Sequence, residues 1–167
     1  MDPATPFYSA LTSVSFTLLG VWFAVMQLGH GEWRESRHRS TLHIALHFFL
    51  PGLAGLVALL AGNTAGGLIW RVAFLVVGIV GVAESIGFLG APDAPRAAAG
   101  RFLAVLDVPV YGVVAAGTFV RPDQLALTPL QLEGLANASV FVIGTCLVWL
   151  AFAERRSSTV QAGGTSG

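Results

Sequence analysis

The sequence predicts an all-α integral membrane protein, a bundle of five transmembrane helices. Of the 167 residues, 54% are hydrophobic and only 11% are charged, whereas a soluble domain carries about 25% charged residues. Five apolar stretches are each long enough to cross the hydrocarbon core of a bilayer, which takes about 20 residues of helix. The length of the chain allows one domain.

The first three spans are expected at residues 7–29, 41–61 and 69–91. The first is too long for a signal peptide, and only the acidic Asp2 precedes it where a signal peptide would carry basic residues. The second follows an arginine-rich segment. The third follows the uncharged loop 62–67, which suits a short turn that has crossed the membrane.

The last two spans are expected at residues 102–120 and 134–153, joined by a loop over 121–133 that contains two prolines. Together the five spans form one transmembrane domain over residues 1–156. The remaining segment, 157–167, is rich in serine, glycine and threonine and is expected to form a disordered cytoplasmic tail. In lipid, each span must satisfy its own backbone hydrogen bonds, so every span is expected to be helical.

The arginines predict the orientation, because basic residues accumulate on the cytoplasmic side of a membrane. One side of the predicted topology receives Arg34, Arg37, Arg39, Arg96, Arg101, Arg155 and Arg156, and the other receives Arg71 and Arg121. This distribution places the N-terminus outside and the C-terminus in the cytoplasm, and the expected location is the plasma membrane of a bacterium. The formal net charge is zero, so we expect the lipid bilayer rather than nucleic acid as a partner.

Three ionisable residues inside the spans are expected at one depth. Counting 1.5 Å per residue from the cytoplasmic ends places His47, Glu84 and Asp107 roughly 8–10 Å inside the membrane. A charge at that depth is costly and therefore suggests a function. Neighbouring turns bring three more polar residues toward this layer: His43, Tyr111 and Gln27.

The residue types in this layer support three interpretations. Imidazoles and carboxylates are ligands for transition metals. The same groups relay protons, because histidine titrates near neutral pH. They also satisfy one another in a purely structural role that fixes the positions of the helices.

A second polar feature runs along the first span, where Ser9, Ser13 and Thr17 recur every four residues. Such a stripe lines a pore in an oligomer. Alternatively, it allows two helices to pack closely and to hydrogen-bond.

The leading functional hypothesis is a small transport protein, a homo-oligomeric channel or carrier for protons or cations. Its path would use Glu84, Asp107, His47, Tyr111, Gln27, Ser9, Ser13 and Thr17. An alternative is a membrane-embedded metalloenzyme that acts on lipids at the inner leaflet, with metal ligands His43, His47, Glu84 and Asp107. The third hypothesis is a non-catalytic scaffold or accessory subunit. The chain has no lysine, no phosphate-binding GxxxxGK[ST] motif and no HExxH zinc motif. We therefore favour a protein that is not an enzyme, and the sequence does not identify a cofactor.

Overall fold

The computed structural model describes residues 4–28, 38–61, 67–95, 97–122 and 126–163, with side chains up to residue 153. Its five long helices are α1 (Ala4–Leu28), α3 (His38–Ala61), α4 (Leu68–Leu89), α5 (Ala98–Gly117) and α6 (Pro129–Gly163). Each of the five is long and apolar enough to cross a membrane. The prediction of an all-helical chain with five such segments is therefore confirmed.

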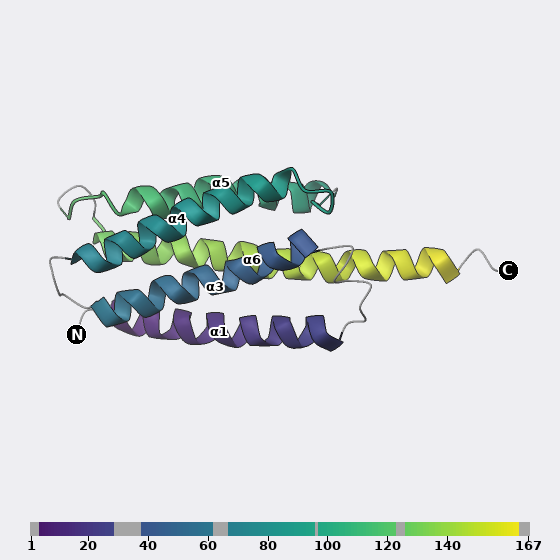
Figure 1. The fold of residues 1–167 in the computed structure, drawn as a ribbon, viewed down its shortest axis with the longest axis horizontal. Coiled ribbons are helices and arrows are strands. Elements are labelled where there is room, and N and C mark those ends of the chain that lie inside the picture. The colour runs from purple at the N-terminus through teal and green to yellow at the C-terminus, as the bar shows by residue number, and fades with distance from the viewer. Residues whose placement is uncertain (1–3, 29–37, 62–66, 96, 123–125, 164–167) are drawn as a thin grey trace.

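The helices lie side by side along the long axis of the molecule, and consecutive helices run in opposite directions (Figure 1). Each end of the bundle is named here after an arginine near it. The Arg39 end is where α3 begins, and the Arg71 end is where α4 begins. The helix α6 extends past the other helices at the Arg39 end (Figure 1).

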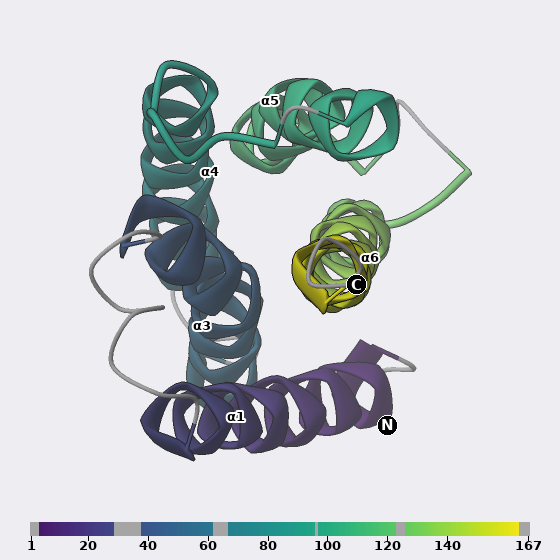
Figure 2. The same cartoon turned by 90° about the vertical axis from the view of Figure 1, so that its right-hand side faces the viewer.

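Viewed end-on, α3 lies between α1 and α4, and α6 lies between α1 and α5 (Figure 2). Contacts run from α1 to α3, α4, α5 and α6 in turn and back to α1, and α3 also contacts α6. In the apolar 18-residue stretch of α3, 61% of the residues are buried, against 22–33% in the corresponding stretches of the other four helices. Since α3 is the central helix, polar residues on it are enclosed rather than exposed at the perimeter.

Most helix ends lie within five residues of the expected bounds: α5 starts at Ala98 rather than at 102, and α6 starts at Pro129 rather than at 134, within the segment expected to be a loop. The helix α3 starts at His38 rather than at 41, and α6 continues to Gly163, so it includes seven residues of the segment that was expected to be a disordered tail. Residues 154–163 contain no proline and several good helix formers. Extending an existing helix through them needs no new nucleation. The last part of the expected tail, 164–167, and most of the arginine-rich loop, 29–37, lie outside the described residues.

The apolar core falls into two parts. One lies among α1, α3 and α6 and comprises Trp22, Met26, Ile44, Ala45, Phe48, Ile143 and Leu147. The larger one includes residues of all five helices and fills the half of the bundle at the Arg71 end; its fully buried members are Ala54, Phe74, Val114 and Val140. The polar layer described next lies beside these cores, on the faces of α3, α4 and α5.

Candidate functional site

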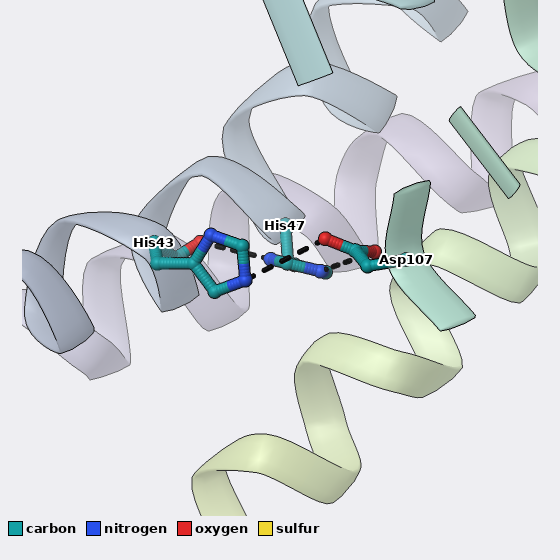
Figure 3. A group of neighbouring side chains, drawn as sticks. All are labelled: His43, His47 and Asp107. Atoms are coloured by element: carbon teal, nitrogen blue, oxygen red, sulfur yellow. Dashed lines mark hydrogen bonds and ion pairs between the residues drawn. The ribbon is translucent and has the colours of Figure 1, made fainter. Parts of the chain in front are cut away.

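Asp107 of α5 is the centre of a buried polar cluster (Figure 3). Its side chain has no exposed surface. Oδ1 lies 2.8 Å from Nε2 of His47, which α3 contributes. Oδ2 accepts a hydrogen bond of 2.6 Å from the Ser85 hydroxyl on α4. Three helices therefore meet at one carboxyl group.

The hydrogen bonds of His47 determine where a proton must lie. Its Nδ1 is 2.8 Å from the backbone oxygen of His43, and because a carbonyl oxygen only accepts, Nδ1 carries the hydrogen. In a neutral imidazole Nε2 is then an acceptor, and an ionised Asp107 is an acceptor as well. Two acceptors do not approach to 2.8 Å without a hydrogen between them. The pair therefore holds one proton, on the carboxyl group or on the ring.

His43 completes the cluster from one turn earlier in α3. Its ring stacks on Phe88, with centroids 3.9 Å apart and planes 19° apart. Its Nε2 lies 3.5 Å from Oδ2 of Asp107. Among the described residues, neither ring nitrogen of His43 has a hydrogen-bond partner, although the side chain is buried. This imidazole is therefore an unused donor and acceptor beside the Asp107 carboxyl group.

About 130 Å³ of space between side chains adjoins the cluster. This space is divided into gaps so narrow that no water molecule fits in this conformation. Its polar lining comes from His43, His47, Glu84, Ser85 and Tyr111. The Tyr111 ring approaches His47 edge-on, with centroids 5.9 Å apart, and its buried hydroxyl has no hydrogen-bond partner in the described chain. The site is dry, and two of its polar groups have unused bonding capacity.

Glu84 lies at the edge of this layer and pairs with an arginine. Its Oε1 is 3.3 Å from Nη2 of Arg39, and the two side chains are 16% and 38% exposed. The ion pair links this buried space to the more exposed Arg39 end of the bundle. Glu84, a predicted metal ligand, is not one of the three described residues whose ligand atoms lie together.

Those three residues, His43, His47 and Asp107, each present a ligand atom within 4.8 Å of the others. The bond from Nδ1 of His47 to a carbonyl oxygen is the kind that orients metal-binding histidines. Two ligands of one tetrahedral zinc ion, with bonds of about 2.0–2.1 Å, lie about 3.3 Å apart. The 2.8 Å between His47 and Asp107 is instead a hydrogen-bond distance. In this conformation the site is arranged for a proton.

Two glycines allow the helices to close around the cluster. A Cβ atom at Gly144 of α6 would lie 2.5 Å from the Cβ atom of His47. A Cβ atom at Gly81 of α4 would overlap the Tyr111 ring. Both glycines are buried, so the backbones of α4 and α6 support the two side chains directly.

The other predicted path residues lie elsewhere. Ser9, Ser13, Thr17 and Gln27 are all exposed on the outer face of α1. The Thr17 hydroxyl donates to the Ser13 backbone oxygen at 2.7 Å. Within one chain, the structure therefore does not bring this stripe to Asp107.

Ser85 and Glu133 are buried polar residues that the sequence patterns do not mark as functional. Ser85 donates to Asp107. Glu133 was assigned to the loop before the last span, yet its side chain has no exposed surface. The spacing of four residues between Glu133 and Asn137 is the signal that places both on one face of α6.

The cluster thus combines a proton-sharing pair, a second imidazole with free ring nitrogens, and an ion pair leading to one end of the bundle. No protein-family model, curated protein or solved structure matches this chain.

Proposed function

We propose that this protein crosses a bacterial plasma membrane five times, with its N-terminus outside, and moves protons through the His47–Asp107 pair. The exposed surface supports membrane insertion, because every helix presents large apolar side chains outward; examples are Phe23, Leu60, Val76, Phe102 and Val142. The excess of arginine at the Arg39 end supports a cytoplasmic location for that end.

The single observation that carries the proposal is the proton held between His47 and Asp107. Both are bases when deprotonated, both are buried, and they are 2.8 Å apart. Losing the shared proton would place two acceptors against each other in a dry interior, at a cost of several kcal/mol. Deprotonation therefore favours a different conformation, and this coupling of proton release to conformational change is what a proton carrier requires.

The surroundings of the pair favour a carrier over an open pore. The adjoining space does not admit water in this conformation, and the larger apolar core fills the bundle toward the Arg71 end. A hydrated cation therefore has no route past Asp107 through the described residues. The Glu84–Arg39 pair is the connection to the cytoplasmic side.

The proposed assembly is a homo-oligomer. The hydroxyl stripe Ser9, Ser13 and Thr17 lies on the outside of α1, where a second copy would contact it. Small hydroxyl side chains let helices pack closely in a membrane. We therefore favour the helix-packing role of the stripe over the lining of an oligomeric pore, since Asp107 lies inside the bundle and not beside the stripe.

Proton flux into liposomes tests the proposal. Purified protein is reconstituted with a pH-sensitive dye inside the vesicles, and a potassium gradient with valinomycin supplies the driving force. Wild type is expected to acidify the vesicles faster than empty liposomes do, and Asp107→Asn is expected to match empty liposomes. The asparagine amide can donate to Nε2 of His47 while its oxygen accepts from Ser85, so this variant keeps the local bonds but cannot exchange a proton.

The matched control is Asp93→Asn, which makes the same chemical change after the end of α4. Asp93 accepts a bond of 2.8 Å from the backbone nitrogen of Ser40, and an asparagine oxygen would still accept it. This control is expected to retain full flux. Flux in wild type at the level of empty vesicles, or equal flux in wild type and Asp107→Asn, would remove the proposal.

The triad His43, His47 and Asp107 favours one second candidate, a transition-metal site. It would serve metal transport or a metal-dependent reaction on lipids at the inner leaflet. This candidate predicts stoichiometric zinc, manganese or iron in gently purified protein, and loss of that metal in His43→Gln. Metal-free protein that shows no proton flux would instead favour a scaffold or accessory subunit.

A further inference from the structure

Glu133 is a second acid enclosed in the bundle, far from Asp107. It is the fifth residue of α6, near the Arg71 end, and its side chain has no exposed surface. Neither carboxyl oxygen has a hydrogen-bond partner among the described residues, and neither does Oδ1 of the equally buried Asn137. Three buried oxygen acceptors on adjacent turns therefore lack a donor.

The helices around Glu133 do not supply that donor. A Cβ atom at Gly117 would lie 2.7 Å from Oε1 of Glu133, so the carboxyl group faces the α5 backbone. From α1, the Tyr8 hydroxyl donates to the backbone oxygen of Leu130 at 2.7 Å instead. The amide nitrogen of Asn137 donates to the backbone oxygen of Glu133 itself, at 2.9 Å.

Arg71 of α4 interacts electrostatically with Glu133, but its guanidinium group is hydrogen-bonded to other residues. It donates to the backbone oxygens of Thr118 and Val120 and lies 4.7 Å from the centre of the Trp70 ring. No ion pair joins Arg71 to Glu133 in the described part of the chain. An ionised Glu133 would therefore be a buried charge without a direct partner, which is strongly unfavourable.

Protonation resolves this imbalance. A protonated carboxyl group is a donor, and residues four apart on a helix lie next to each other. The acid hydrogen of Glu133 would then satisfy Oδ1 of Asn137. We infer that Glu133 and Asn137 form a second proton-binding site near the Arg71 end of the bundle, in which Glu133 is a neutral carboxylic acid.

The two sites are separated by an apolar layer. Glu133 lies against Gly117, ten residues beyond Asp107 in α5, which corresponds to about 15 Å along the helix. Val114 and Val140, both fully buried, belong to the core in this half of the bundle. This assignment rests on the proposed function: Glu133 lies toward the outer end of the same proton route, and Asp107 lies between Glu133 and the Glu84–Arg39 pair.

Infrared spectroscopy of the reconstituted protein tests the protonation state directly, because a carboxylic acid and a carboxylate absorb at different frequencies. At neutral pH, where an exposed glutamate is ionised, wild type is expected to show a carboxylic acid band that Glu133→Gln weakens, and the Glu133 part of this band is expected to persist in Asp107→Asn. A spectrum that Glu133→Gln leaves unchanged would overturn the inference. Conversion of the band to carboxylate on adding sodium would also overturn it, since the site would then bind a metal cation.

Liposome flux separates this inference from the proposed function. Glu133→Gln is expected to reduce proton flux to the level of empty vesicles, with thermal unfolding confirming that the variant is folded. Wild-type flux in folded Glu133→Gln would overturn the place of Glu133 in the route and leave the function of Asp107 standing. Wild-type flux in Asp107→Asn would instead overturn the proposed function, whatever Glu133→Gln does.

Discussion

Replacing Asp107 by alanine and by asparagine separates the hydrogen bonds of this residue from its charge. Alanine leaves Nε2 of His47 and the Ser85 hydroxyl without their partner in a dry interior. Each orphaned group costs about 1–3 kcal/mol, so Asp107→Ala is expected to lose about 2–6 kcal/mol of unfolding free energy. Asparagine offers a donor to His47 and an acceptor to Ser85, so Asp107→Asn is expected to lose less than about 1 kcal/mol.

The measurement is unfolding of the purified protein in mixed micelles with increasing sodium dodecyl sulfate, followed by circular dichroism and tryptophan fluorescence. Trp22 and Trp70 are buried, so their emission reports loss of the packed bundle. Equal destabilisation by asparagine and alanine would refute the reasoning that the cost depends only on unsatisfied hydrogen bonds. It would place the shared proton on the His47 ring, in a buried ion pair with Asp107, because removing one partner of such a pair costs about 3–5 kcal/mol.

Three further substitutions test the packing and the ion pair. Gly144→Ala would place a methyl group 2.5 Å from the Cβ atom of His47, and the expected loss is about 1–3 kcal/mol of unfolding free energy in the same micelle assay. Tyr8→Phe removes the bond between α1 and α6 and is expected to cost about 1 kcal/mol there. Arg39→Gln breaks the partly exposed pair with Glu84; stability should change by less than about 1 kcal/mol, while liposome flux falls.

Much of the fold could be predicted because hydrocarbon thickness and helix rise are fixed quantities. Long apolar runs have one stable form in lipid, and α4 at Leu68–Leu89 closely matches the expected 69–91. The meeting of His47 with Asp107 could be anticipated by counting residues from the ends of two antiparallel helices. Depth along the bundle is therefore readable from the sequence.

Rotation of each helix about its own axis is much harder to read. When almost every residue is apolar, the contrast that marks the inward face of a helix is weak. The sequence alone therefore does not show that the Ser13 stripe faces outward while Ser15 is buried, nor that Glu84 pairs with Arg39. Glu133 was missed for a different reason, since helix ends are uncertain by a few residues and it lies just before the expected span.

Gly81 and Gly144, which have no side chains, matter to anyone who wishes to rebuild this site in a designed bundle. Grafting His43, His47 and Asp107 onto standard scaffolds would reproduce the chemical groups but not the spacing between helices, because a methyl group at either position would hold the partners apart. A successful template must therefore specify where side chains are missing as carefully as where they are present.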